Sequence, residues 1–177
     1  MHLLIDDQGN ILLDYAKRYL FGMGDVGETG AFRKGAEVIQ SVQTPYGKMA
    51  VTLCRDVEMV DYIRQAGLAH VDIMFAPANQ VTKDLVVHSN YMRTIENGFS
   101  LIRAAYNGIS VAVDYNGKIL NQMDSLETDD GIMYADIPTR GIRTLYTTIG
   151  DAFGWMCVAA GLIVLSMIYR KNKDTSE

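Results

Sequence analysis

The stretch MAVTLCRD, from Met49 to Asp56, decides the fold. An apolar run ends there in Cys54, and a basic and an acidic residue follow at once. A short apolar run of this kind predicts a buried strand. A thiol at the end of such a strand is either a buried packing residue or a nucleophile. If it is a nucleophile, its partner groups must come from other parts of the chain.

The segments on either side of this stretch predict an alternation of strands and helices. Asn116-Gly117 predicts a tight hairpin turn, and Gly67 and Gly98 are the expected helix ends. A glycine-rich loop covers 21–35. We therefore expect an α/β layered domain with a mixed sheet. The predicted strands cover 2–5, 11–15, 38–44, 49–54, 71–77, 100–105, 110–115, 119–123 and 131–138, and the predicted helices cover 58–69 and 85–98.

Composition limits the function classes. A chain of 177 residues suits one domain with a sizeable core. The formal net charge is −5 and no basic patch runs through the domain, so we expect no nucleic-acid partner. Two widely separated cysteines do not make a disulfide framework. The glycine-rich loop lacks the Gly-Lys-Ser/Thr of a phosphate loop, and no Cys/His cluster occurs, so we expect neither a cofactor nor a metal.

The end of the chain has the properties of a membrane span. Ala152 to Tyr169 carries no charge and is long enough to cross a bilayer, and the basic run Arg170 to Lys173 follows it. By the positive-inside rule the tail faces the cytoplasm and the domain lies on the extracytoplasmic side of the cell membrane. The alternative is the buried core helix of a soluble protein. We divide the chain into a domain at 1–146, a transmembrane helix at 147–169 and a basic cytoplasmic tail at 170–177.

The neighbours of Cys54 favour a catalytic thiol. The backbone N–H of Arg55 follows the nucleophile directly, where it would donate to a developing oxyanion. A nearby lysine would favour the thiolate and stabilise a tetrahedral intermediate. Lys17 is a candidate because it follows a predicted strand and precedes the glycine-rich loop. Lys34 and Lys48 are equally possible partners from their positions in the sequence.

Seven segments follow one another along the chain in the order of one family's motifs. They are Tyr15–Leu20, Phe21–Asp25, Cys54–Asp56, Arg93–Gly98, Arg103–Ser110, Asp114–Ile119 and Gly141–Gly150. These segments resemble motifs of the carbon–nitrogen hydrolase (nitrilase) superfamily, and within it of the membrane-bound branch typified by apolipoprotein N-acyltransferase. The resemblance implies the C-terminal part of a nitrilase-like four-layer α-β-β-α sandwich, followed by one transmembrane helix.

The resemblance implies a Glu-Lys-Cys triad. It assigns Cys54 as the nucleophile and Lys17 as the charge stabiliser. The family's general-base glutamate lies well before the lysine motif, and no glutamate occurs among the residues that precede Lys17. Neither Asp6, Asp7 nor Asp14 matches its motif. We therefore expect the base to be missing from this sequence, together with the N-terminal half of the same domain.

Three further residues are candidates for the site. Asp25 lies eight positions after Lys17, where the family has an acidic residue, and it either contacts substrate or orders the loop. Asp56 either hydrogen-bonds near the nucleophile or caps the helix that begins near Glu58. Asn79 lies in the segment Ala76–Val81, which stands where the branch has an N-x-S-N-D-x-W stretch, and it fits an asparagine of that stretch, whereas the aspartate and tryptophan have no counterpart. Because this segment lies where substrate should be bound, the substrate stays open.

The resemblance implies thiol-based acyl chemistry at a bacterial membrane. Cys54 would form a thioester with the acyl group of a phospholipid and pass it to the N-terminal amine of a lipoprotein. With water as the acceptor, the chain would be an amidase-like hydrolase of small amides. A third alternative is a catalytically inactive, membrane-tethered chain, because the glutamate base is missing.

Overall fold

The computed structural model describes residues 2–23, 27–81, 90–127 and 131–174. The chain separates into two compact units, Met1–Thr147 and Thr148–Glu177. The first holds the sheets and the candidate site, and the second holds one long helix.

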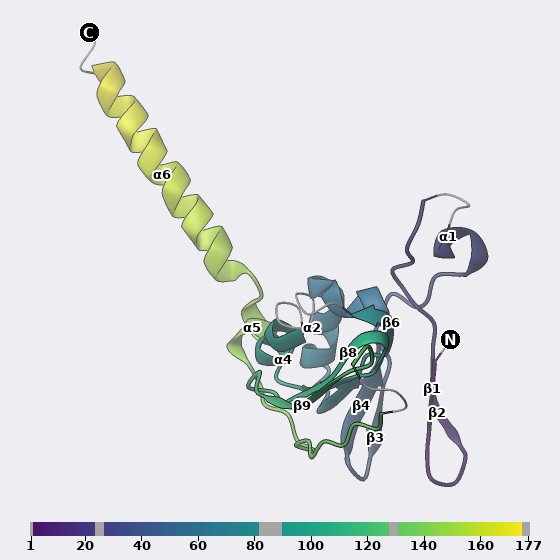
Figure 1. The fold of residues 1–177 in the computed structure, drawn as a ribbon. Helices are drawn as coiled ribbons and strands as arrows, with labels where there is room; N and C mark the ends of the chain where they lie inside the picture. The colour runs from purple at the N-terminus through teal and green to yellow at the C-terminus, as the bar shows by residue number, and fades with distance from the viewer. Residues whose placement is uncertain (1, 24–26, 82–89, 128–130, 175–177) are drawn as a thin grey trace. The chain divides into compact units, whose positions relative to one another are not determined.

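The first unit is built on a mixed sheet of seven strands (Figure 1). Its order is β3-β4-β5-β7-β8-β6, and β9 also pairs with β8. The pairs β4–β5, β5–β7 and β6–β8 are parallel, while β3–β4, β7–β8 and β8–β9 are antiparallel. The predicted mixed sheet is confirmed. The strands are β3 (Ser41–Thr44), β4 (Gly47–Val51), β5 (Ile73–Phe75), β6 (Ala78–Val81), β7 (Ser100–Arg103), β8 (Ala105–Val113) and β9 (Ile119–Asp124).

Helices connect the parallel strands. The 3₁₀ helix η1 (Cys54–Glu58) and helix α2 (Val60–Leu68) join β4 to β5, and α4 (Tyr91–Asn97) precedes β7. Crossovers of this kind place helices against a sheet face. The buried residues Tyr62, Ile63 and Ala66 lie on α2 and belong to the main core. Two short helices, α1 (Glu28–Ala31) and α5 (Leu145–Ile149), complete this part of the chain.

Both faces of strand β4 are covered. Ala50 and Val51 are both buried, although successive strand residues point to opposite faces. Leu4 and Leu13 of the N-terminal hairpin pack against the same core as these residues. Cys54, which follows the carboxyl end of β4, therefore lies between the parts of the chain that cover the two faces of this strand.

The N-terminal hairpin forms a separate two-stranded sheet, as the sequence predicts. Strands β1 (His2–Ile5) and β2 (Ile11–Tyr15) are antiparallel, and Leu4 pairs with Leu13. Asp6 organises the turn by accepting hydrogen bonds from the N–H groups of Gln8 and Asn10. An isolated hairpin is only marginally stable in water, so its packing on the core holds it in place. The hairpin leads directly into the segment that carries Lys17.

The predicted helix end at Gly67 is wrong. Helix α2 continues to Leu68, and the chain turns at His70, whose φ is +56°. Gly67 is small for a packing reason, because a β-carbon there would lie 2.3 Å from the Thr147 side chain. The prediction for Gly98 is confirmed: its φ is +74°, and its N–H donates to the Thr94 carbonyl after α4.

Two strand predictions need correction. In the described part of 131–138 no strand forms, because carbonyl groups there accept hydrogen bonds from side chains of the sheet. Asn121 donates to the Tyr134 carbonyl and Ser100 to the Pro138 carbonyl. Conversely, β6 is not among the predicted strands, but it pairs in parallel with β8. The C-terminal half of the helix predicted at 85–98 is α4, and 82–89 lies outside the described residues.

The second unit is the helix α6, which runs from Ala152 to Asp174 over 23 residues. Its segment Ala152–Asn172 has a mean hydropathy of 2.0, and none of its most apolar window is buried. The helix is long and apolar enough to cross a membrane. It contains the whole uncharged stretch from Ala152 to Tyr169 on which the membrane prediction depends.

Candidate active site

Cys54 sits on a strained turn at the end of a strand. It follows β4 and opens η1 with a φ of +52°, a left-handed conformation that residues with a β-carbon rarely adopt. The Cys54 N–H donates to the Pro77 carbonyl at 2.9 Å, which fixes the turn against the next strand. Strain of this kind concentrates at functional sites, and nucleophiles often occupy sharp strand-to-helix turns. The geometry therefore favours a nucleophile over a packing residue.

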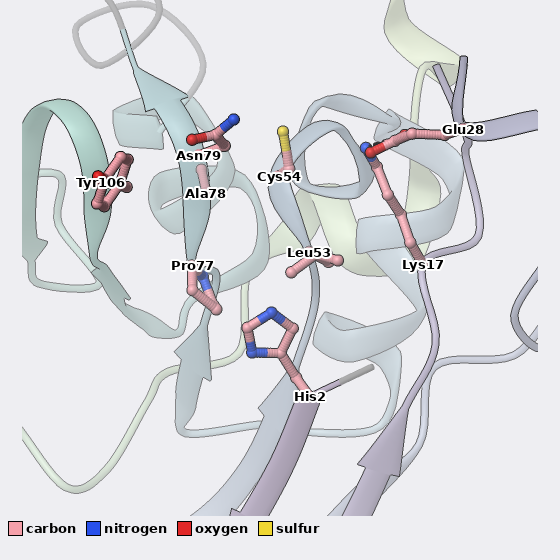
Figure 2. Close-up of a pocket in the computed structure, with 9 residues that line it drawn as sticks. All are labelled: His2, Lys17, Glu28, Leu53, Cys54, Pro77, Ala78, Asn79 and Tyr106. Atoms are coloured by element: carbon pink, nitrogen blue, oxygen red, sulfur yellow. Dashed lines mark hydrogen bonds and ion pairs between the residues drawn. The ribbon is translucent and has the colours of Figure 1, made fainter. Parts of the chain in front are cut away.

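Lys17 reaches the same pocket from the segment after β2. Its side chain is 8% exposed, and its carbonyl accepts the Gly35 N–H at 2.9 Å. Lys48 instead donates to the Ala69 carbonyl at the opposite end of β4. Of the lysines weighed from the sequence, Lys17 is the one that lines the pocket with Cys54. That pocket has a volume of about 360 Å³ and is lined by His2, Lys17, Glu28, Leu53, Cys54, Pro77, Ala78, Asn79 and Tyr106 (Figure 2).

Glu28 is the counter-ion of Lys17, a contact that the sequence reasoning missed. Its Oε2 lies 2.5 Å from Lys17 Nζ and accepts the Phe21 N–H at 2.7 Å. Burial acts to raise the pKa of Glu28, but the hydrogen bonds from Lys17 and Phe21 and the lysine charge outweigh it, so this pKa lies below its ordinary value. Figure 2 shows the paired groups beside the Cys54 thiol. Asp25, the acid chosen from the sequence, lies outside the described residues.

Asp56 is fully buried two residues after the nucleophile. It accepts hydrogen bonds from Tyr15 Oη at 2.5 Å, the Tyr19 N–H at 2.7 Å and the Arg18 N–H at 3.0 Å. Burial and the contact with Asp56 raise the pKa of Tyr15, so its hydroxyl stays a donor. Helix α2 has no side-chain cap hydrogen bond at its N-terminus. The helix-cap alternative for Asp56 is therefore wrong, and its carboxylate holds the Lys17 segment instead.

Arg55 directly follows the nucleophile, and Asn79 lines the pocket. The Arg55 side chain is exposed, and Asn79 reaches the pocket from β6. Because the Cys54 N–H is already bonded to Pro77, the Arg55 N–H is the next backbone donor after the nucleophile. Its role as an oxyanion donor stays a prediction, as does substrate contact by Asn79.

The sequence can now be placed among known proteins. The profile of the Carbon-nitrogen hydrolase family matches residues 1–146, which is most of the chain. The chain belongs to the carbon-nitrogen hydrolase family. The resemblance drawn from its motifs is thereby confirmed.

Several curated relatives of this carbon-nitrogen hydrolase are acyltransferases. The apolipoprotein N-acyltransferase of Geobacter metallireducens is 23% identical over 91% of this chain and 30% of its own length. The enzyme of that name from Vibrio parahaemolyticus is 29% identical over 80% of this chain and 29% of its own length. A hydrolase encoded in the pqqF 5′ region of Pseudomonas protegens is 30% identical over 65% of this chain and 40% of its own length. The chain thus spans about 30% of the length of these acyltransferases.

A solved structure supports the predicted fold class. A mutant of the amidase from Nesterenkonia sp. AN1, with acrylamide added at its active-site cysteine, superposes with a TM-score of 0.63 at 24% identity. The match covers 69% of this chain and 51% of the amidase chain. The nitrilase-like fold is confirmed, and the matched region corresponds to about half of that neighbour.

A second cavity adjoins the pocket that Cys54 and Lys17 line in this carbon-nitrogen hydrolase. Its volume is about 270 Å³ and most of its lining is apolar. It shares Lys17, Glu28 and Leu53 with the first pocket, so the ion pair lies in the wall common to both. Among the described residues, no group of three or more His, Cys, Asp or Glu is placed to hold a metal ion. The second cavity is lined by Ala16, Lys17, Leu20, Glu28, Phe32, Arg33 and Leu53.

Proposed function

We propose that this chain supplies the nucleophile and the charge-stabilising lysine for a thiol-based acyl transfer at a membrane surface. The acyl donor is a phospholipid, and the acceptor is the N-terminal amine of a lipoprotein. The observation that carries the proposal is the strained Cys54 in one pocket with the buried Lys17. The domain lies on the extracytoplasmic side and α6 spans the membrane, with the tail cytoplasmic.

The chemistry proceeds in two acyl-transfer steps. The Cys54 sulfur, after losing its proton to a general base, attacks the ester carbonyl and forms a tetrahedral oxyanion. The Arg55 N–H and the Lys17 ammonium stabilise that charge. The C–O bond then breaks, and the lysophospholipid leaves with the proton from the base. The amine next attacks the thioester carbon, the C–S bond breaks, and the base takes the amine proton.

The base is expected from the N-terminal half of the family's domain. Glu28 is engaged with the Lys17 ammonium, and its pKa lies below the ordinary value, so it is poorly suited to take the thiol proton. In this proposal Glu28 orients the Lys17 ammonium. Asn79 and Tyr106, on the opposite rim of the pocket, contact the bound donor or acceptor.

Two observations support a lipid donor over a small amide. The second cavity presents Leu20, Phe32 and Leu53 immediately beside the catalytic pair, where an acyl chain would lie. The helix α6 has the length and composition of a membrane anchor. The hydrolase relative and the amidase-like fold favour hydrolysis of small amides as the second candidate function.

The test is transfer of a labelled acyl group. The chain in lipid nanodiscs, together with the N-terminal half of a family member's domain that carries the base, is incubated with acyl-labelled phospholipid and a lipopeptide that has a free N-terminal amine. We expect a thioester on Cys54 by intact mass and label in the lipopeptide, and neither product with Cys54→Ala. Ammonia release from small amides without lipid dependence would instead identify the amidase. If neither product forms, the inactive membrane-tethered alternative is supported.

A further inference from the structure

We propose that Asp56 is a positioning residue, whose buried carboxylate fixes the backbone on both sides of Lys17 against the turn that carries Cys54. This inference rests on the proposed function, in which Lys17 and Cys54 act together on the acyl group. Asp56 itself touches neither the Lys17 ammonium nor the substrate. It acts by fixing the position of the Lys17 backbone, from which the lysine side chain extends.

The contacts of Asp56 bracket Lys17 in the sequence. Tyr15, two residues before the lysine, donates its hydroxyl at 2.5 Å. The backbone N–H groups of Arg18 and Tyr19, which directly follow the lysine, donate at 3.0 and 2.7 Å. The carboxylate belongs to η1, which opens at Cys54. One side chain therefore joins the nucleophile turn to a segment 37 to 41 positions away in the sequence.

These contacts require a carboxylate. All three groups are donors, and an ionised aspartate offers only acceptors. An asparagine of the same shape would aim an N–H₂ group at one or more of them and leave buried donors unpaired. Asp56 is 0% exposed, and the three charge-assisted hydrogen bonds stabilise its charge. Tyr15 Oη also lies 3.3 Å from Tyr62 Oη on α2, which ties the group to the helix layer.

The ammonium group of Lys17 is restrained separately from the backbone of this residue. Glu28 binds the ammonium at 2.5 Å from the first residue of the short helix α1, which follows the lysine segment. Without Asp56, the lysine and its counter-ion would be free to shift together away from Cys54. The hairpin would still pack through Leu4 and Leu13. Loss of Asp56 should therefore disturb the site more than the fold.

The test measures the Lys17–Cys54 proximity directly. In a Cys157→Ala background, a short cross-linker reactive toward one amine and one thiol is applied, and the Lys17–Cys54 product is quantified by peptide mass spectrometry. We expect Asp56→Asn to lower this yield at least several-fold and Asp61→Asn, an exposed acid on α2, to leave it unchanged. Melting temperature reports whether each variant folds.

Kinetics separate positioning from a purely structural role. For the thioester-forming step, measured with the base-carrying N-terminal half of a family domain present, we expect Asp56→Asn to lower kcat by roughly 100-fold with little change in KM, because a displacement of about 1 Å can cost that much in rate. A folded Asp56→Asn protein with unchanged cross-linking overturns the proposal, whether or not the chain transfers acyl groups. If Asp56→Asn does not fold, Tyr15→Phe is tested in its place, because it removes one of the three contacts of Asp56. An unchanged cross-link yield in Tyr15→Phe would equally overturn the proposal.

Discussion

At the scale of single residues, the backbone conformation at Cys54 favours glycine, whereas the proposed chemistry requires a thiol. Its φ of +52° suits glycine, yet the position carries a thiol. A left-handed conformation costs a residue with a β-carbon about 1–2 kcal/mol. A chain without a catalytic use for this thiol would gain stability by replacing it. Retaining the strain is consistent with a nucleophile on a rigid turn.

Replacing Cys54 by glycine should therefore stabilise the protein relative to alanine. We expect Cys54→Gly to exceed Cys54→Ala in free energy of unfolding by roughly 0.5–1 kcal/mol, since the greater freedom of glycine in the unfolded chain offsets part of the relieved strain. Both variants lack the thiol, so the comparison isolates the backbone. Denaturant unfolding of the two proteins in detergent measures it. An alanine variant as stable as the glycine variant would show that the turn is not strained.

The Lys17–Glu28 pair should make stability depend on acid pH. Glu28 has a folded pKa below its ordinary value of 4.5, so the folded state binds fewer protons than the unfolded state as the pH falls through this region. The contribution of the pair is complete above about pH 4.5 and is lost as the pH falls through the folded pKa. We expect Glu28→Gln to lower the melting temperature at neutral pH, and the difference from the unmodified chain to shrink at lower pH.

A matched surface variant controls for loss of charge. Glu37 is 81% exposed and pairs with Arg18, so Glu37→Gln should change the melting temperature little at any pH. Equal effects of the two substitutions, or a Glu28→Gln difference that persists at low pH, would contradict a special role for the Lys17–Glu28 pair.

The residues of the site differ in how far sequence could predict them. Lys17 and Cys54 stand in motifs that resemble those of a family, and the structure places both in one pocket. Glu28 lies in a glycine-rich loop with no periodicity, and only the folding of that loop brings its carboxylate to Lys17. The contacts of Asp56 join segments about 40 residues apart, and no local pattern encodes such a pairing.

At the scale of elements, the close packing of α2 against its neighbours depends on a missing side chain. Helices α2 and α4 are adjacent in Figure 1. A β-carbon on Gly67 would lie 2.3 Å from the Thr147 side chain and 2.9 Å from Asn97 Oδ1. Real β-carbons do not approach other atoms so closely. The glycine thus lets α2 lie directly against α4 and the start of α5.

Gly67→Ala should consequently destabilise the first unit even though alanine favours helices. We expect a loss of roughly 1–3 kcal/mol in free energy of unfolding, the usual penalty for overpacking. Gly161→Ala on α6 is the matched control, because nothing lies within 4 Å of a β-carbon there. Thermal unfolding in detergent would compare the two. A Gly67→Ala protein as stable as the control would show that α2 can move away at no cost.

The elements themselves were predictable where the local pattern was strong. The N-terminal hairpin, the mixed sheet and the helix ending at Gly98 follow from turn residues and apolar periodicity. The strand expected at 131–138 failed because side chains, not a neighbouring strand, satisfy its carbonyl groups. Strand β6 was missed because it depends on pairing with β8, which is distant in the sequence. Both errors concern partners that the local sequence does not specify.

At the scale of the whole molecule, one chain combines a domain that carries a reactive-residue pocket with a long apolar helix. The domain carries a pocket with a thiol and a lysine, and α6 carries 23 residues with mostly apolar, exposed side chains. An amidase acting on small soluble amides has no need for such a helix. The proposed lipid donor would account for both parts, since a membrane-spanning helix would keep the domain at the membrane.

The proposed orientation can be tested by labelling one engineered cysteine at a time. In a Cys54→Ala, Cys157→Ala background, Asp7→Cys probes the exposed hairpin turn and Ser176→Cys probes the tail. In right-side-out inner-membrane vesicles, we expect an impermeant maleimide to label Asp7→Cys at once and Ser176→Cys only after detergent is added. The reason is the basic run Arg170–Lys173, which favours the cytoplasmic side.

Neutralising that run supplies the matched comparison. Changing Arg170, Lys171 and Lys173 to glutamine keeps the apolar stretch and removes the charge that sets its direction. We expect this variant to show a mixed orientation, with part of Ser176→Cys labelled before detergent. The opposite labelling pattern in the parent chain would place the pocket in the cytoplasm, away from a lipoprotein N-terminus exposed outside it. Labelling of both sites without detergent, together with release of the protein by alkaline carbonate, would show that α6 lies outside the bilayer. Only the apolar second cavity would then support a lipid donor.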